Sequence, residues 1–191
     1  SCQLAQDCEL HKKKLSGKKS LELKLDGVRA VSVLYPSGKV DMFSRNGKEL
    51  NNFDHIKDEI KKQIDISFIK HALVLDGEVV SDNFQALMKQ IHRKNSSQNK
   101  DAKLFLFDLL PLESFKKGIY EKPYDVRINW LREIYNKFLQ KSTFINLIES
   151  IHVDLDTELG MEKFKSFNKK SIIDGYDGIM IKDPKSYYEC K

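Results

Sequence analysis

The sequence predicts an α+β domain in which mostly antiparallel sheets are covered by helices on the outside. Three observations support this prediction. Strand-like segments at 20–25, 28–35 and 39–44 follow one another with only short turns between them. Later segments alternate between helical spacing of apolar residues and short apolar strands. No Pro- or Gly-rich linker interrupts the 191 residues, so one domain with one core is expected.

The first strands are predicted from their turns. Asp26-Gly27 is typical of a hairpin, so the segments 20–25 and 28–35 are expected to pair with each other. The Pro-Ser-Gly turn at 36–38 then leads into the third strand. Further strands are predicted at 72–75, 103–110, 145–153 and 178–181.

Helices are predicted where apolar residues recur every three or four positions. The best pattern places Val126, Trp130 and Ile134 on one face, and Asp125 is its expected N-cap. Trp130 is therefore expected in the core. The other predicted helices cover 54–64, 84–92 and 157–168.

The composition excludes several classes of protein. No apolar stretch approaches the roughly 20 residues of a membrane span. Cys2, Cys8 and Cys190 have no spacing that suits a zinc site or a disulfide framework, so a soluble protein of a reducing, intracellular compartment is expected. Lys and Arg exceed Asp and Glu by 33 to 28, and the net charge of +5 suits a polyanionic partner.

One short segment has the residues needed for chemistry on a phosphate. Residues 24–29 read Lys-Leu-Asp-Gly-Val-Arg and place an amine, an acid, a turn glycine and a guanidinium between two strands. A lysine at such a position can serve as a nucleophile. The same pattern also fits a plain hairpin with solvated charges, so other segments must decide between the two.

Four further segments accompany the lysine segment in a fixed order. They are Ser-Arg-Asn-Gly-Lys at 44–48, Leu-Asp-Gly-Glu-Val at 75–79, Phe-Leu-Phe-Asp at 105–108 and Asp-Gly-Ile-Met-Ile-Lys at 177–182. Together the five resemble the covalent nucleotidyltransferases, most closely the adenylation domain of ATP-dependent DNA ligases of small viral or bacteriophage type. The resemblance covers about residues 20–183. It implies an ATP-grasp-like ligase fold whose antiparallel sheets form an ATP cleft.

The resemblance implies a specific reaction. In this family a lysine amine attacks the α-phosphorus of ATP to give a lysyl-AMP intermediate, and Lys24 is the matching residue. The AMP then passes to the 5′-phosphate of a DNA nick, and a 3′-hydroxyl seals the nick. An ATP-dependent DNA ligase of DNA repair, replication or recombination is therefore expected. Its expected partner is nicked double-stranded DNA, and a monomer that binds no membrane is expected.

Four of the implied nucleotide-binding residues have charged side chains, and the two arginines among them match family residues near the sugar and phosphates. Arg29 and Arg45 match arginines whose planar guanidinium donors suit phosphate oxygens. Glu78 matches the acid that accepts a hydrogen bond from the ribose hydroxyl, and Lys182 matches the lysine that closes the last motif. Ion pairs or solvated charges at the surface remain the alternative for these residues.

Four more implied residues surround the base. Phe107 matches the aromatic residue that stacks on adenine, and Met180 matches an apolar residue on its opposite face. Glu22 matches the residue that helps to read the amino edge of adenine, and Leu23 lies next to it in the motif. Ordinary core packing remains the alternative for Phe107 and Met180.

Asp177 departs from the family pattern, which commonly has Glu at this position to help bind a metal ion. Mg²⁺ or another divalent metal is still implied, because a carboxylate is retained. The side chain is one methylene shorter, so coordination through water is an alternative to direct contact. The metal would neutralise the phosphates and orient pyrophosphate as the leaving group.

The domain organisation is expected to have two parts. Residues 1–19 form a basic leader, helical in part, whose lysines are hypothesised to approach the DNA backbone. These lysines are Lys12, Lys13, Lys14, Lys18 and Lys19. Residues 20–191 form an adenylation domain that is C-terminally incomplete, because nothing matches the two α-phosphate lysines and the OB-fold domain that follow in the family. Weak activity of this piece alone is expected for the same reason.

Three alternatives to a DNA ligase stay open. An RNA ligase or an mRNA-capping guanylyltransferase would use the same lysine, and a fragment could bind nucleotide without reacting. The Ser-Arg-Asn-Gly and Asp-Gly-Glu-Val segments, the latter followed by Phe84 and Leu87, favour DNA ligase over the two other enzymes. The cytoplasm or nucleus, or the host cytoplasm for a virus, is the expected location.

Overall fold

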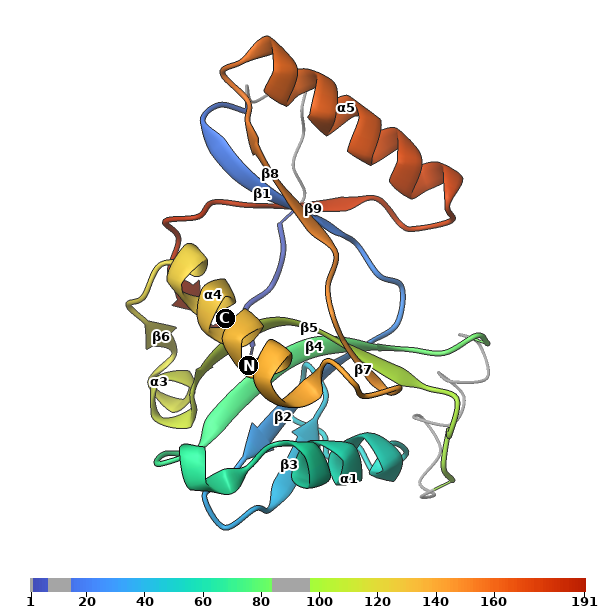
Figure 1. Ribbon diagram of the computed structural model, residues 1–191, viewed down its shortest axis with the longest axis vertical. Helices are drawn as coiled ribbons and strands as arrows, with labels where there is room; N and C mark the ends of the chain where they lie inside the picture. The colour runs from blue at the N-terminus through green and yellow to red at the C-terminus, as the bar shows by residue number, and fades with distance from the viewer. Residues whose placement is uncertain (1, 7–14, 84–96) are drawn as a thin grey trace.

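The computed structural model describes residues 2–6, 15–83 and 97–191, and it places two sheets one above the other along the long axis of the molecule (Figure 1). The smaller sheet has the strand order β8-β1-β9, formed by β8 (Ser150–Asp154), β1 (Lys18–Leu23) and β9 (Ile179–Lys182). The larger sheet has the order β3-β2-β4-β5-β7, formed by β3 (Val40–Phe43), β2 (Val28–Leu34), β4 (Leu73–Val80), β5 (Lys103–Pro111) and β7 (Ile145–Leu147). A short pair is formed by β6 (Ile119–Tyr120) and β10 (Tyr188–Glu189).

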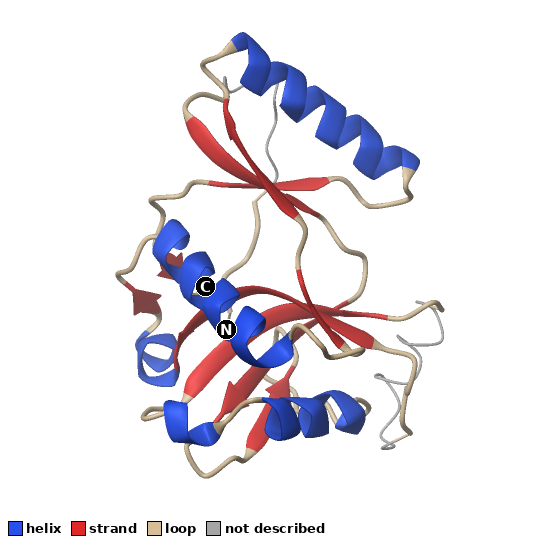
Figure 2. Ribbon diagram, in the orientation of Figure 1, coloured by secondary structure: helices blue, strands red, loops and turns tan. Residues whose placement is uncertain are grey.

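The helices cover these sheets from outside (Figure 2). They are α1 (Asp54–Gln63), α3 (Leu112–Lys117), α4 (Tyr124–Ile134), α5 (Glu158–Ile173), the 3₁₀ helix η1 (Ile66–Phe68) and the π-helix η2 (Tyr135–Leu139). The strand pairs are antiparallel apart from β5 with β7, so the predicted mostly antiparallel α+β architecture is confirmed. None of the helices in the described parts of the chain is long and apolar enough to cross a membrane.

Strict alternation along the strands decides what each face of a sheet contacts. In β2, Val28 and Ala30 join the core under α1 and α4, whereas Val31 and Val33 join a second core that also contains Tyr188. In β1, Leu21 and Leu23 pack against α5. Side chains at the intervening positions of β1 therefore point toward the space between the two sheets.

The hairpin predicted at Asp26-Gly27 is wrong, because β1 and β2 belong to different sheets. The segment between them carries the chain from one sheet to the other. Gly27 is required by a close approach rather than by a hairpin turn, since a Cβ atom there would lie 2.1 Å from the carbonyl oxygen of Val79. The partners of β1 are β8 and β9, which come from the last third of the sequence.

Two further predictions are corrected by long-range contacts. The strand predicted over 145–153 is two strands in two sheets, with Ile148 and Glu149 between them. Asp125 is not the N-cap of α4, because the helix begins at Tyr124 and Pro123 is its N-cap. The first N–H groups of α4 are satisfied from afar instead: Tyr124 donates to the carbonyl of Ser186 at 2.8 Å, and Asp125 to that of Pro184 at 2.9 Å.

Most other elements agree with the patterns that predicted them. The helix predicted over 54–64 is α1, and the one predicted over 157–168 is α5, which begins after an N-cap at Thr157 and extends to Ile173. Trp130 packs against the main core. The turn at 36–38 connects β2 to β3 as predicted.

Part of the predicted leader and one predicted helix lie outside the described residues. Residues 2–6 have no regular secondary structure, and Lys18 and Lys19 begin β1, so no helix is found in the described part of 1–19. The positions that lie outside the described residues are Lys12, Lys13, Lys14, Phe84, Leu87 and the helix predicted over 84–92.

A β-bulge in the centre of the larger sheet shapes the space between the sheets. Asp76 pairs with Asp108, and Gly77 with Leu106, so Phe107 is the extra residue on β5. Gly77 allows this close approach, because a Cβ atom at that position would lie 2.4 Å from the carbonyl oxygen of Phe105. Bulges of this kind redirect side chains at functional sites.

Replacing Gly77 with alanine is expected to destabilise the protein by about 2–4 kcal/mol, because the new methyl group has no space beside β5. Urea denaturation followed by circular dichroism measures this change. Gly47→Ala is the matched control: its Cβ atom meets nothing within 4 Å, so only the strain of its φ of 82° contributes, about 1 kcal/mol. Equal losses in the two variants would contradict the steric account of Gly77.

Candidate active site

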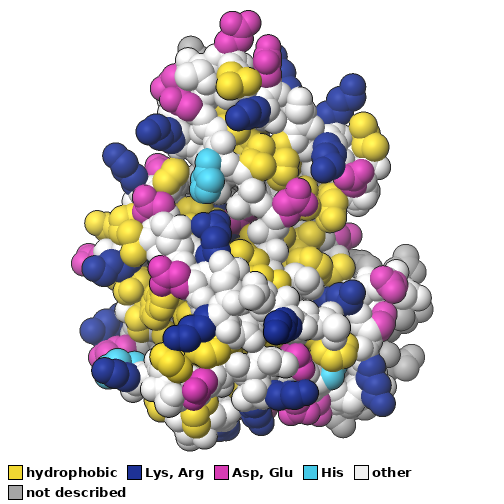
Figure 3. All heavy atoms as spheres, in the orientation of Figure 1, with side chains coloured by type: hydrophobic (Ala, Val, Ile, Leu, Met, Phe, Trp, Pro, Cys, Tyr) yellow, Lys and Arg dark blue, Asp and Glu magenta, His cyan; other side chains and the backbone are white. Residues whose placement is uncertain are grey.

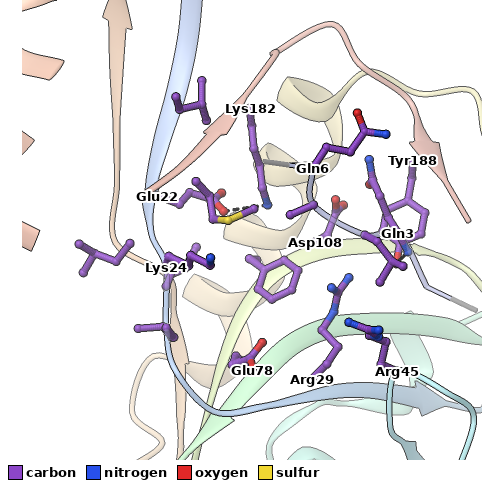
Figure 4. Close-up of a pocket in the computed structure, with 18 of the residues that line it drawn as sticks. Gln3, Gln6, Glu22, Lys24, Arg29, Arg45, Glu78, Asp108, Lys182 and Tyr188 are labelled. Atoms are coloured by element: carbon purple, nitrogen blue, oxygen red, sulfur yellow. Dashed lines mark hydrogen bonds and ion pairs between the residues drawn. The ribbon is translucent and has the colours of Figure 1, made fainter. Parts of the chain in front are cut away.

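A cavity of about 1220 Å³ lies between the two sheets, and the predicted site residues gather around it. Residues from both sheets line it, together with the N-terminal segment 3–6. The predicted residues that line it are Glu22, Leu23, Lys24, Arg29, Arg45, Glu78, Phe107, Met180 and Lys182. Figure 4 shows several of these side chains, from strands far apart in sequence, directed toward a common centre.

Lys24 follows the last residue of β1, where the chain leaves the smaller sheet. Its backbone N–H donates to the carbonyl of Gly178 at 3.0 Å, and its carbonyl accepts from the N–H of Asp177 at 3.3 Å. The Lys24 ammonium lies 3.8 Å from the Asp177 carboxylate, and these side chains are 45% and 62% exposed. The two segments are thus held together by the backbone, while the amine itself stays accessible.

The Glu22 carboxylate is buried and accepts hydrogen bonds from two side chains. The residue is 2% exposed. Its Oε1 atom lies 2.7 Å from the Lys182 ammonium, and its Oε2 atom accepts a hydrogen bond from the Tyr124 hydroxyl. Burial, together with this carboxylate, raises the pKa of Tyr124 well above its ordinary value, so the phenol remains protonated and donates.

Asp76 is a second buried carboxylate, and it holds Arg29 in a bidentate pair. Arg29 Nε donates to Oδ1 and a terminal nitrogen to Oδ2, each at 2.6 Å. The Tyr188 hydroxyl donates to the same Oδ2 atom. Burial opposes the charge on Arg29, but Asp76 outweighs it and raises the pKa of Arg29. Arg29 keeps further N–H groups for a ligand, since a guanidinium has five.

The Phe107 ring contacts two cationic side chains, those of Arg29 and Lys182. The centroid of its ring lies 4.8 Å from the Arg29 guanidinium carbon and 4.6 Å from the Lys182 ammonium. Such contacts are favourable because the ring face carries negative charge. Met180 lies directly opposite Glu22 in the β1–β9 pairing, so an apolar side chain, an aromatic ring and a carboxylate occupy the same end of the cavity.

Glu78 and Arg45 line the cavity from the larger sheet and from the turn after β3. Glu78 lies opposite Arg29 in the β2–β4 pairing. Burial raises the pKa of Glu78 to about 7, although Arg29 opposes the shift. The turn containing Arg45 is closed by a hydrogen bond from the Ser44 N–H to the Lys48 carbonyl at 2.7 Å. Arg45 itself is exposed at the edge of the cavity.

A third buried ion pair lines the cavity. Asp108 accepts from Arg127 at 2.8 Å and 3.2 Å, and both side chains are at most 4% exposed. Arg127 also donates to the carbonyls of Lys122 and Ser186 at 2.6 Å and 2.9 Å. The pair therefore fixes the segment after β9 against the beginning of α4.

The described residues suit a divalent metal that is held by one carboxylate together with phosphate oxygens and water. No group of three or more His, Cys, Asp or Glu within the described ranges could enclose a metal ion. Mg²⁺ does not require such a group, since one carboxylate with substrate phosphates and water suffices. The exposed Asp177 carboxylate beside Lys24 suits that role, although Asp177 does not itself line the cavity.

Comparison with known proteins identifies the family. The sequence matches the family described as "ATP dependent DNA ligase domain" over residues 2–191. The chain belongs to this family. The ligase domain is 26% identical to a DNA ligase of Saccharolobus shibatae over 182 residues, and 28% identical to a DNA ligase of Methanococcus maripaludis over 190. These alignments cover 89% and 87% of the chain but only 28% and 31% of the relatives, so the chain spans about three tenths of their length.

Solved structures agree with this assignment. The ligase domain is similar over its whole length to a structure titled "Pmar-Lig_PreS3", with a TM-score of 0.92 and 48% identity, and covers 44% of that chain. It also shares the fold of the bacteriophage T7 ATP-dependent DNA ligase in complex with ATP, with a TM-score of 0.69 and 19% identity. That alignment covers 91% of the ligase domain and 59% of the T7 chain.

Several residues that line the cavity of the ligase domain, or that hold a residue lining it, are not predicted from the sequence. Asp76 and Asp108 stand inside the motifs at 75–79 and 105–108, so their position was a usable signal. Tyr124 and Tyr188 stand outside every motif, and only tertiary packing brings their hydroxyls to Glu22 and Asp76. Gln3 and Gln6, which line the cavity from the N-terminal segment, likewise had no signal.

The raised pKa of Glu78 predicts a pH dependence of the ligase domain's stability. The folded protein binds the Glu78 proton more tightly than the unfolded chain, whose pKa is near 4.5. The contribution is therefore complete below about pH 4.5 and is lost as the pH rises through about 7, with a magnitude of ~1–3 kcal/mol. Urea titrations from pH 5 to 8 should show wild type losing stability relative to Glu78→Gln.

Glu113→Gln provides the matched control for this titration, because its side chain is 84% exposed. It should follow wild type at every pH. A difference between wild type and Glu78→Gln that does not change over the same range would contradict a raised pKa at Glu78.

Proposed function

We propose that this chain is the adenylation domain of an ATP-dependent DNA ligase in which Lys24 is the nucleophile. The supporting observation is the convergence of nine predicted residues from separate segments on one cavity, with the Lys24 amine accessible at it. A plain surface hairpin, the competing interpretation of the lysine segment, has no reason to produce that convergence. Membership of the ligase family supports the same assignment.

The proposed first step is a phosphoryl transfer to nitrogen. The deprotonated Lys24 Nζ attacks the α-phosphorus of ATP, an N–P bond forms, and the bond from the α-phosphorus to the bridging oxygen breaks. Pyrophosphate leaves, and the second amine proton passes to solvent, giving lysyl-AMP. The residues around Lys24 contribute by positioning and by charge, because this chemistry needs little else from the protein.

The residues that line the cavity could contact the base, the ribose and the phosphates of ATP. Phe107 and Met180 provide apolar contact for the base, and Glu22 accepts hydrogen bonds at its edge. Glu78 would accept from a ribose hydroxyl. The free N–H groups of Arg29 and the exposed Arg45 would attract the phosphates, while Lys182 would stay paired with Glu22 at the end that holds the base.

Asp177 is proposed to hold the divalent metal, together with phosphate oxygens and water. The metal supplies positive charge that neutralises the phosphates of ATP. Asp177 itself lies close enough to Lys24 to pair with its ammonium before nucleotide binds. Its proposed contribution is therefore to keep the amine near the position where attack occurs.

Nicked double-stranded DNA is the proposed substrate of the later steps. AMP passes from Lys24 to the 5′-phosphate of the nick, and the 3′-hydroxyl then attacks that phosphate and releases AMP. The DNA ligase relatives support this proposal. On the face drawn in Figure 3, basic side chains are spread among acidic ones over both parts of the molecule, which suits attraction to a polyanion without a single dominant patch. A monomeric enzyme inside the cell, in the compartment that holds its DNA, completes the proposal.

Labelling with α-³²P nucleotides tests the proposed first step. The chain incubated with α-³²P-ATP and Mg²⁺ is expected to acquire a covalent label that EDTA prevents and that α-³²P-GTP does not give. Lys24→Ala and Lys24→Arg should lose at least 99% of the label, because neither side chain presents a nucleophilic amine. Chasing the labelled protein with nicked duplex DNA, or with a nicked RNA duplex, identifies the acceptor.

Lys39→Ala is the control, since Lys39 pairs with Asp41 at 3.4 Å on another part of the larger sheet. It should label as wild type does. Full labelling of Lys24→Ala, or a label obtained from GTP alone, would contradict the proposed function. Preferential transfer to RNA would overturn the proposed substrate while leaving the nucleophile in place.

A further inference from the structure

The Glu22 carboxylate is fixed by two side chains that come from different parts of the fold. Lys182 stands on β9, the strand next to β1, and its ammonium lies 2.7 Å from Oε1. Tyr124 is the first residue of α4 and donates its hydroxyl proton to Oε2. The dashed line in Figure 4 marks the contact of Glu22 with Lys182.

Tyr124 is itself held rigidly, so its hydroxyl has a defined position. The residue is 1% exposed and belongs to the main core. Its backbone N–H donates to the Ser186 carbonyl at 2.8 Å, and the neighbouring Arg127 donates to the same carbonyl. The phenol stays protonated, because burial and Glu22 both raise its pKa. Without this donor, Oε2 of Glu22 would be buried beside a phenyl ring, and Lys182 alone would leave the carboxylate free to rotate.

A carboxylate fixed in this way selects the group that approaches it. An ionised carboxylate has about four acceptor positions and no proton to donate. Two positions are used here, so a group reaching Glu22 from the cavity must bring an N–H or O–H. Phe107 and Met180 lie at the same end of the cavity. A purine between them would present its six-membered edge to Glu22, where adenine has a donor amino group and guanine an acceptor oxygen.

We infer that Tyr124 is a positioning residue for base selectivity, acting by holding Glu22 so that it accepts the 6-amino group of adenine and rejects purines without a donor there. This inference rests on the proposed function, in which the cavity binds ATP. A purely structural role for Tyr124 would weaken every nucleotide equally. A positioning role changes the ratio between nucleotides that differ only at the 6-position.

Equilibrium binding of ATP and of purine riboside 5′-triphosphate, which lacks the 6-amino group, measures that ratio by titration calorimetry on the full chain. Wild type should bind ATP at least about tenfold more tightly than the analogue, because a fixed acceptor left without its donor is costly. Tyr124→Phe should reduce the ratio at least about threefold, through weaker ATP binding, while the affinity for the analogue changes less than about twofold. Tyr35→Phe, just beyond the opposite end of β2 from Arg29, should leave both affinities unchanged.

The results separate this inference from the proposed function. Failure of wild type to bind ATP would overturn both. Binding of ATP with a ratio near one in wild type, or an undiminished ratio in Tyr124→Phe, would overturn the inference alone.

A second pair of variants covers the case in which Tyr124→Phe does not fold, since it leaves an ionised carboxylate oxygen without a partner. Glu22→Gln and the double variant Glu22→Gln with Tyr124→Phe remove that charge. Because Tyr124 acts through Glu22, the two should have the same ratio of affinities. A further fall of the ratio in the double variant would contradict the inference.

Discussion

The Asp76 carboxylate is the group around which the cleft is organised. It is completely buried in β4, the central strand of the larger sheet, and accepts hydrogen bonds from Arg29 on β2 and Tyr188 on β10. A buried carboxylate that loses its partners typically costs several kcal/mol, so these three side chains act as one unit. The backbone N–H of Gln3 also donates to the Tyr188 hydroxyl at 3.3 Å. The N-terminal segment, the last strand and the motif arginine therefore meet at a single buried charge.

Other buried ion pairs of an acid with a cation also lie at the cavity. Among the described residues, Glu22 with Lys182 and Asp108 with Arg127 likewise pair an interior acid with a cation that lines the cavity. Each pair neutralises a buried charge and at the same time fixes the direction of the cation's remaining N–H groups. Donors fixed before the ligand arrives need little reorganisation during phosphoryl transfer. These ion pairs explain why a motif contains an acid such as Asp76, which holds a cation in place, as well as the residues that are proposed to contact ATP.

Much of the site could be predicted because its residues stand in short motifs at strand ends. Lys24, Glu78 and Met180 each lie in such a segment, and the resemblance of these motifs to the ligase family is what assigned the three residues to one site. The pairing of strands could not be predicted in the same way. Asp26-Gly27 has the composition of a hairpin turn, yet Gly27 serves a close approach to Val79, because β1 pairs with two strands from the other end of the sequence.

The two tyrosines that donate to buried carboxylates are also beyond prediction from the sequence. Tyr124 and Tyr188 have no motif around them, and a tyrosine in a helical or apolar segment is ordinary core in most proteins. Only the folded chain brings their hydroxyls to Glu22 and Asp76. The predicted N-cap of α4 is wrong because long-range contacts replace a local cap. The first N–H groups of the helix donate to the carbonyls of Ser186 and Pro184, far along the chain.

A double-mutant cycle on ATP binding tests most directly whether Asp76 organises the cleft through Arg29. Arg29→Gln, Asp76→Asn and the double variant would be compared with wild type by titration calorimetry, with circular dichroism to verify folding. Each single change is expected to weaken ATP binding at least about tenfold, and the double variant should be no weaker than Arg29→Gln alone, within about twofold. Folded Asp76→Asn protein with wild-type affinity, or losses that multiply in the double variant, would contradict the account.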